Sequence, residues 1–339
     1  MSERSDQSLQ RTQAMLTTAM GPQIVAALDD PSVVEVLANP DGCLWIERHG
    51  AGRVQTDSLI LATQAERVIR LVASHMGQDV TRDHPIVSAE LPGSGDRFEG
   101  VLPPVATAPC FSIRKAAAQA FTLEDYVSAG TLSPVHARLL KQAVLERQNI
   151  LIVGGTGSGK TTLANALLQE VAHTGDRVVL LEDTRELQCA AADQVALRTA
   201  AANAGSAGVT LADLVKSTLR LRPDRIIIGE VRGPEALDLL KAWNTGHPGG
   251  IATIHANSGK DGLHRLEQLV GERAANVPRS LITQAIDLLV FIAGRGPARR
   301  VEHILTVLGS DDQDYRCADA AYPDLSLVPS HPSTVGDLP

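Results

Sequence analysis

The segment LIVGGTGSGKTTL, Leu151–Leu163, decides how the second half of this chain folds. It fits the pattern of glycine, four residues, glycine, lysine and serine or threonine, which carries meaning only between a strand and a helix. The apolar run NILIV (149–153) precedes it, and TTLANALLQEVA (161–172) follows with helix formers and apolar positions at helical spacing. The sequence therefore predicts a buried parallel strand, a glycine-rich loop and a helix, in that order.

Such a loop is suited to binding the phosphate chain of a nucleotide. Its backbone N–H groups and the positive end of the following helix can surround a phosphate with donors. Lys160 would add a positive charge, and the Thr161 hydroxyl would ligate Mg²⁺. The residues expected to bind phosphate are Gly155, Thr156, Gly157, Ser158, Gly159, Lys160, Thr161 and Thr162.

Length and composition indicate the number of domains and disfavour two kinds of nucleic-acid-binding protein. A chain of 339 residues is long for one domain, so two domains are expected, and a hydrophobic content of 44% allows full cores. The formal net charge of −8 disfavours a broad nucleic-acid groove. An aromatic content of 3% also argues against a platform that stacks single-stranded bases.

Cysteines and apolar runs indicate where the protein works. The four cysteines lie far apart and form no CxxC pair, which favours reduced thiols over a zinc site or a disulfide framework. The first twenty residues contain no apolar export region, and no apolar run is long enough to span a bilayer. We therefore expect a cytoplasmic protein whose association with a membrane, if any, is peripheral.

The apolar pattern predicts an α/β protein with an N-terminal α+β domain over 1–117, a linker over 118–134, and a second domain over 135–308. In the first domain, residues 32–48 predict a hairpin, 63–76 a helix, and 97–105 and 110–115 further strands. The second domain alternates helices with apolar strands, which indicates a mostly parallel sheet. Its further strands are expected at 177–181, 194–198, 225–230, 250–254 and 287–292. We expect residues 309–339 to form a loosely ordered tail.

Acidic residues follow two of these strands, where ligands of a parallel sheet collect. The segment EDTRE (182–186) follows the strand at 177–181, and Glu230 ends the strand at 225–230. Glu230 would hold a metal or polarise water, although a solvated carboxylate before the helix at Pro234 is the alternative. For the EDTRE acids, an ordinary acidic loop is the alternative. Spacing alone favours structural roles for His247 and His255 over contacts with phosphate.

Four segments together resemble the secretion, or traffic, ATPase superfamily. They are GGTGSGKTT (154–162), LLEDTREL (180–187), LRLRPDRIIIGEVRGPEA (219–236) and TGHPGGIATIHANS (245–258), which resemble its Walker A, Asp box, Walker B and His box. The resemblance extends over about residues 10–305 and implies a RecA-like ATPase domain behind the α+β domain. It implies ATP and Mg²⁺ as ligands and Lys160, Glu186, Glu230 and His255 as catalytic residues. Thr161 and Glu230 would hold the metal, and His255 would sense the γ-phosphate.

The resemblance also implies roles for the N-terminal domain and for partners. Arg97 in GDRFEG and Arg114 in SIRK match segments that send arginines to the nucleotide, and ordinary strand-surface arginines are the alternative. The family forms hexameric rings on secretion machinery at the inner membrane. Within the family, these segments and the lack of a four-cysteine zinc motif resemble the conjugal transfer ATPases of type IV secretion most.

Other functions stay open at the level of sequence. A type II secretion or pilus-assembly ATPase shares these motifs. A RecA-like nucleic-acid motor shares the core, although the acidic balance and the few aromatic residues count against it, and no stable nucleic-acid binding is expected. A nucleotide switch that does not hydrolyse ATP is a third possibility, which the full set of acids disfavours.

Overall fold

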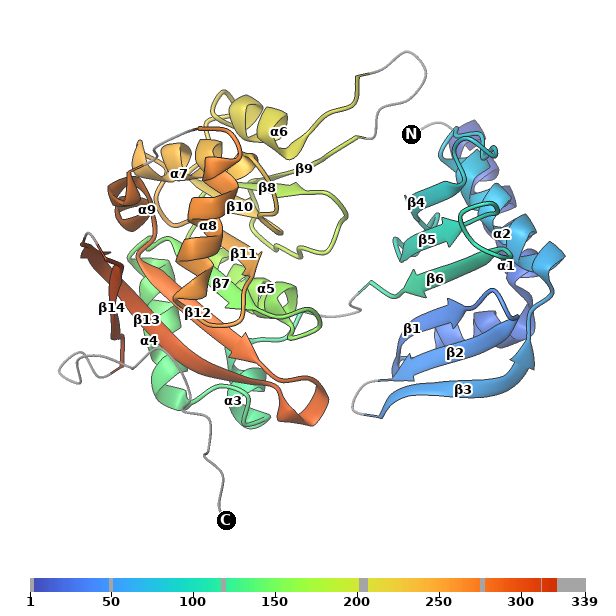
Figure 1. Ribbon diagram of the computed structural model, residues 1–339, viewed down its shortest axis with the longest axis horizontal. Helices are drawn as coiled ribbons and strands as arrows, with labels where there is room; N and C mark the ends of the chain where they lie inside the picture. Colours follow the sequence, from blue (N-terminus) through green and yellow to red (C-terminus); the bar gives the residue numbers. More distant parts are fainter. Residues whose placement is uncertain are drawn as a thin grey trace. The chain divides into compact units, whose positions relative to one another are not determined.

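The structure is a computed structural model that describes residues 3–48, 51–116, 120–200, 207–274, 278–311 and 313–321. The chain divides at residue 119 into two units, each built around a sheet (Figure 1). No helix in the described ranges combines the length and apolar character needed to cross a bilayer.

The first unit is a six-stranded antiparallel sheet with two helices packed on one face. The strands follow the order β3-β2-β1-β6-β5-β4, and α1 and α2 share one apolar core with them. The α1 helix is broken at Gly21, whose φ of 77° precedes Pro22. The elements are α1 (Glu3–Asp29), β1 (Val33–Ala38), β2 (Cys43–Arg48), β3 (Gly52–Leu59), α2 (Ala62–His75), β4 (Ile86–Glu90), β5 (Arg97–Val101) and β6 (Cys110–Arg114).

The second unit contains an eight-stranded sheet in the order β14-β13-β12-β7-β11-β10-β8-β9. The six strands from β12 to β9 are parallel, and β13 and β14 are antiparallel additions at one edge. The strands are β7 (Ile150–Gly154), β8 (Val178–Glu182), β9 (Gln194–Arg198), β10 (Arg225–Ile228), β11 (Ile251–His255), β12 (Leu288–Ala293), β13 (Arg300–Ser310) and β14 (Tyr315–Asp319). The mostly parallel sheet predicted from alternating strands and helices is confirmed.

Helices cover both faces of this sheet. The central strand β7 shows why, because its residues are buried on both sides: Ile150 and Ile152 join one core, and Leu151 and Val153 join the other. On the Ile150 side lie α3 (Leu123–Ser128), α4 (Pro134–Leu145) and α5 (Lys160–Val171). On the Leu151 side lie α6 (Leu211–Thr218), α7 (Glu235–Asn244), α8 (Asp261–Gly271) and α9 (Arg279–Ala285).

Two predicted boundaries differ from the observed elements. The α3 helix lies inside the predicted linker 118–134, yet its Leu123 and Tyr126 are buried in the core of the second unit. The β14 strand lies inside the predicted tail 309–339 and pairs with β13, with Tyr315 only 1% exposed. Both elements are too short and too polar to give a periodic signal, and packing against the sheet stabilises them. The prediction for 322–339 lies outside the described residues.

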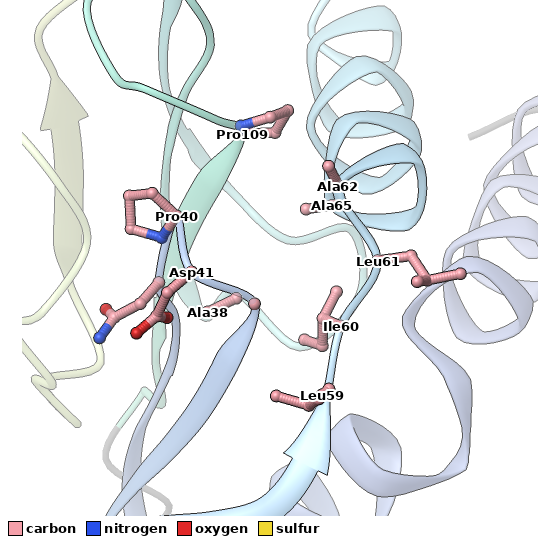
Figure 2. A pocket seen from close by; sticks show the side chains of 11 residues that line it. Ala38, Pro40, Asp41, Leu59, Ile60, Leu61, Ala62, Ala65 and Pro109 are labelled. Atoms are coloured by element: carbon pink, nitrogen blue, oxygen red, sulfur yellow. The ribbon is translucent and has the colours of Figure 1, made fainter.

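A pocket of about 260 Å³ lies in the first unit, where the β1–β2 turn meets the segment from β3 to α2 (Figure 2). Pro40, Pro109 and the side chains of Leu59, Ile60 and Leu61 line it. The walls hold together because Ile60 N–H donates to the Gly42 carbonyl at 2.8 Å. The lining is largely apolar and its acid, Asp41, accepts a hydrogen bond from the Cys43 backbone, so the pocket lacks the cations that a phosphate would need.

Candidate active site

The glycine-rich loop joins β7 to α5, as the sequence predicts. A side chain at Gly154 could not be accommodated, because its Cβ would lie 2.3 Å from the Ile292 carbonyl oxygen of β12. Gly159, with φ of 93°, directly precedes α5 and caps it without a side-chain hydrogen bond, and the first turn contains no acid. Within the described chain, the buried Ser158 hydroxyl has no hydrogen-bond partner. The first N–H groups of a helix and a hydroxyl without a partner can both donate hydrogen bonds to a bound phosphate.

Lys160, the first residue of α5, is 6% exposed, and its ammonium group contacts both the loop and His255. Its Nζ donates to the Gly155 carbonyl at 3.1 Å and lies 3.2 Å from Nδ1 of His255. The Nε2 atom of the same histidine lies 2.8 Å from Oε1 of Glu230. The structure therefore joins the predicted lysine, histidine and glutamate in one chain of contacts.

Two charged side chains lie beside the His255 ring. The Glu230 carboxylate can only accept, so Nε2 of His255 carries the proton that faces it. Nζ of Lys160 lies 3.2 Å from Nδ1 and 3.4 Å from Nε2, so its positive charge disfavours a second proton on the ring. Partial burial lowers the pKa of His255 below its ordinary 6.5, the charges of Lys160 and Arg232 lower it further, and Glu230 opposes them. His255 therefore lies between the ammonium group of Lys160 and the carboxylate of Glu230.

The sheet itself brings these side chains together. Parallel strands end at the same edge, and β7, β11 and β10 are neighbours, so the loop, His255 and Glu230 all emerge there. The link between β10 and β11 is reinforced beyond the last ladder pair. Thr253 donates from its hydroxyl to the Gly229 carbonyl at 2.7 Å, and its own carbonyl accepts from Val231 N–H at 2.9 Å. Glu230 is thereby held beside β11.

Arg232 extends the cluster and was not predicted as a site residue. Its Nε lies 3.1 Å from Oε2 of Glu230, and its Nη2 lies 3.5 Å from Oδ2 of Asp183, just past β8. The guanidinium group therefore bridges the two acidic segments that follow β8 and β10. In the sequence, Arg232 is visible only as the arginine two residues after Glu230 in GEVRG. The local turn that directs its side chain toward Glu230 cannot be read from those letters.

The other acids after β8 have different surroundings. Glu182 is 4% exposed, and its Oε1 accepts the Leu187 N–H at 2.6 Å, which closes the loop onto the end of the strand. Glu186 is half-buried in this loop. Its predicted role as a catalytic acid stays a prediction.

The two histidines of the His box lie at opposite ends of β11. His247 precedes the strand, and its Nδ1 lies 3.2 Å from the Ala242 carbonyl oxygen. The structural role that spacing suggests fits His247. His255 ends the strand and contacts Lys160 and Glu230 instead. Spacing could not separate the two residues, because only the direction of the strand places one of them at the phosphate loop.

Thr161, predicted to bind both metal and phosphate, and Thr162, predicted to bind phosphate, lie in the first turn of α5 and are both half-buried. Among the described residues, no group of three or more histidines, cysteines or acids is arranged to hold a metal ion.

Arg97 and Arg114 belong to the first unit and lie side by side. They are direct cross-strand partners in the antiparallel pair β5–β6, so their side chains project from the same face of the sheet, and both are exposed. Arg114 is also the partner of Glu35 on β1. The structure thus forms an arginine pair on this face. Its contact with a nucleotide stays a prediction.

The family model described as "Type II/IV secretion system protein" matches residues 19–295. The chain belongs to this secretion family. The "Conjugal transfer protein TrbB" of Rhizobium radiobacter is 47% identical over 89% of this chain and 92% of its own length. The "Probable conjugal transfer protein TrbB" of Sinorhizobium fredii is 49% identical over 86% of this chain and 88% of its own. The family assignment implied by the four motifs is confirmed.

Solved structures agree on the fold. The ATPase DotB of Legionella pneumophila superposes with a TM-score of 0.59 at 19% identity, covering 84% of this chain and 79% of that one. At this identity the likeness concerns the fold alone. Together with the phosphate loop, Glu230 and His255, membership of the family identifies this secretion protein as an ATP-hydrolysing enzyme.

Proposed function

We propose that this secretion ATPase powers conjugative transfer through a type IV secretion apparatus. Two relatives that are 47% and 49% identical over most of both chains carry the name conjugal transfer protein TrbB. A third, 30% identical over 82% of this chain, is the type IV secretion system protein VirB11 of Bartonella henselae. These names favour conjugation over a type II or pilus-assembly machine.

The observation that carries the enzymatic part is the chain of contacts Lys160–His255–Glu230 beside the phosphate loop. Lys160 would exchange the neutral Gly155 carbonyl for a charged phosphate oxygen, which forms a stronger hydrogen bond. That movement withdraws the ammonium group from His255 and lets the histidine respond to the γ-phosphate. Glu230 would then orient and polarise the attacking water.

Mg²⁺ fits the residues at this site. When bound, Mg²⁺ would supply positive charge that neutralises charge developing on the transferred phosphate. The Thr161 hydroxyl would ligate it from the first turn of α5, and Glu230 would hold it directly or through water. Glu186 is proposed as a further acid at the same edge of the sheet.

The assembly we propose is a hexameric ring on the cytoplasmic side of the inner membrane, attached to the conjugation machinery. Arg97 and Arg114 would bind the nucleotide phosphates from the first unit, because guanidinium groups suit phosphate geometry. A nucleotide held by both units favours their closure, and hydrolysis releases it. Repeated closure is the proposed source of mechanical work.

Two substitutions test the enzyme. Lys160→Ala should abolish nucleotide binding or turnover. Glu230→Gln should bind ATP normally and lower turnover by about 100-fold or more, the order that a general base contributes. Glu272→Gln, an exposed carboxylate after α8, is the matched control and should behave like the wild type. Normal turnover by Glu230→Gln would contradict the mechanism.

The biological role needs its own measurements. Cells in which Glu230→Gln replaces the wild-type gene should lose plasmid transfer while keeping normal growth, whereas Glu272→Gln should restore transfer. The mass in solution, measured with Mg²⁺ and a slowly hydrolysed ATP analogue, should be that of a hexamer. Transfer at the wild-type frequency by Glu230→Gln would exclude a role in conjugation even if the purified protein hydrolyses ATP.

A further inference from the structure

Two arginines hold the phosphate loop from the turn between β12 and β13. This turn contains the short helix η1 (Gly296–Ala298) and follows Gly294 at φ of 77°. The strand β12 is parallel to its neighbour β7, so it ends at the same edge as the phosphate loop, and β13 returns antiparallel. The turn is therefore forced to lie beside the loop. Arg295 and Arg299 extend from it.

Both guanidinium groups donate to carbonyls of the loop. Nε of Arg295 donates to the Thr156 carbonyl at 3.1 Å, and Nη2 of Arg299 donates to the Gly157 carbonyl at 3.4 Å. A Cβ added at Gly159 would lie 2.9 Å from Nε of Arg299. Glycine at this position therefore lets the loop lie directly against the arginine.

These contacts act on two N–H groups of the loop, of which Ser158 N–H donates to the Gly155 carbonyl at 3.3 Å. The Thr156 carbonyl shares a peptide group with Gly157 N–H, and the Gly157 carbonyl shares one with Ser158 N–H. Because a peptide group is planar and trans, holding the carbonyl on one side directs the N–H to the other. A donor on the carbonyl also polarises the N–H and strengthens its own hydrogen bond.

The charges of the two arginines are not neutralised nearby. In the part of the chain that the structure describes, neither guanidinium forms an ion pair with a carboxylate, whereas the adjacent Arg300 pairs with Glu302 at 3.3 Å. Nε of Arg299 is buried without a hydrogen-bond partner in the same ranges, as is the Tyr126 hydroxyl. Two unpaired cations beside the loop raise its potential for an anion.

We propose that Arg295 and Arg299 are positioning residues of the phosphate loop, which keep the Gly157 N–H directed at the nucleotide, hold the turn that Ser158 N–H closes on the Gly155 carbonyl, and add positive potential behind the loop. This inference rests on the proposed nucleotide site. The proposed role differs from the predicted roles of Arg97 and Arg114, which lie in the first unit. Arg295 and Arg299 lie in the second unit and act through the backbone of the loop.

The test measures binding of inorganic pyrophosphate and of ADP by calorimetry to the full chain. The double variant Arg295→Ala/Arg299→Ala should weaken both by roughly tenfold, the order expected from losing one or two hydrogen bonds. Arg300→Ala, which removes a neighbouring exposed arginine, should bind both like the wild type. In steady-state ATPase assays the double alanine variant should raise KM while kcat stays within about twofold, because Lys160, Glu230 and His255 are untouched.

The lysine pair Arg295→Lys/Arg299→Lys should recover most of the affinity, since it restores the charge and one donor at each site. A purely structural contact would lower the unfolding temperature without this recovery. Unchanged pyrophosphate affinity in the double alanine variant overturns the inference. Should that variant fail to fold, unchanged affinity in both single alanine variants has the same meaning. If the wild type binds neither pyrophosphate nor ADP, the proposed function itself fails.

Discussion

The contacts of Lys160 include the Gly155 carbonyl and the ring of His255, and both are weaker partners than a phosphate oxygen. We expect a bound phosphate to replace these contacts of the nearly buried ammonium group. The exchange also changes the surroundings of His255, since the lysine is one of the charges that lower its pKa.

The His255 ring should titrate in opposite directions in two variants. In the nucleotide-free protein its pKa lies below 6.5. Lys160→Ala removes a positive charge and should raise that pKa, whereas Glu230→Gln removes a negative charge and should lower it further. Nuclear magnetic resonance of labelled histidine rings measures both, with His255→Asn identifying the signal. Shifts of the same sign in the two variants would exclude the arrangement described.

At the scale of single residues, the sequence predicts those that belong to a contiguous motif. Lys160, Glu230 and His255 lie in such segments, and the structure brings them together. Arg295 and Arg299 lie over 130 residues after the loop they contact, in a turn with no pattern of its own. Only the strand order places them there, so no reading of local sequence could have found them.

Among the elements of the second sheet, the parallel strands were predicted well, including β9 at one edge, and the antiparallel strands β13 and β14 were not predicted. Strands such as β7 and β10 are buried on both faces, so their sequences are continuous apolar runs that few other structures allow. The β13 and β14 strands mix polar and apolar residues, because one side faces solvent and they lie at the edge. Their stability comes from pairing with β12, which is a property of the sheet rather than of the segment.

The start of β10 is held by a buried ion pair. Arg225 is 1% exposed, and its Nε lies 2.6 Å from Oδ2 of Asp176 before β8. A second guanidinium nitrogen donates to the Val144 carbonyl of α4 at 2.8 Å. The pair thereby links two strands of the sheet to a helix that covers one of its faces.

Replacing Arg225 by Met should lower the free energy of unfolding by about 3–5 kcal/mol, because it leaves the Asp176 carboxylate buried with weaker compensation. Urea unfolding measures the change. The exposed pair of Arg70 and Glu66 in α2 is the control, and Arg70→Met should cost less than about 1 kcal/mol. Equal losses in the two variants would show that burial of the Arg225 pair has no special effect.

The same pair predicts a dependence on pH. Burial alone raises the pKa of Asp176, but hydrogen bonds from Arg225 and Thr174 outweigh it and hold the pKa below the ordinary 3.8. A lowered acid pKa stabilises the folded state above 3.8, and this contribution disappears as the pH falls through the folded-state value. Arg225→Met should therefore flatten the acid limb of the stability curve.

Over the whole molecule, each unit has its own core and one of the two tryptophans. Trp45 lies in β2 of the first unit, and Trp243, 3% exposed, lies in α7 of the second. Each unit can therefore be followed separately by fluorescence after the other tryptophan is replaced with phenylalanine. The two cores predict two cooperative unfolding transitions rather than one.

Bound nucleotide should raise the unfolding temperatures of both units if Arg97 and Arg114 bind it from the first unit. A ligand stabilises the folded unit that it contacts. Trp45→Phe reports on the second unit and Trp243→Phe on the first, each compared with and without ADP. In the double variant Arg97→Ala/Arg114→Ala, ADP should raise the unfolding temperature of the second unit only. A first-unit transition that ADP never moves would assign the two arginines to the strand surface.

The four cysteines bear on how the proposed closure of the two units could be followed with attached dyes. Cys43 and Cys110 lie in the first unit, Cys189 and Cys317 lie in the second, and all four are free thiols. Burial raises the pKa of every one of them, that of Cys317 to about 11. Since alkylating reagents attack the thiolate, the native cysteines should label slowly at neutral pH. A dye should therefore react mainly with an exposed cysteine introduced in either unit, without prior removal of the native cysteines.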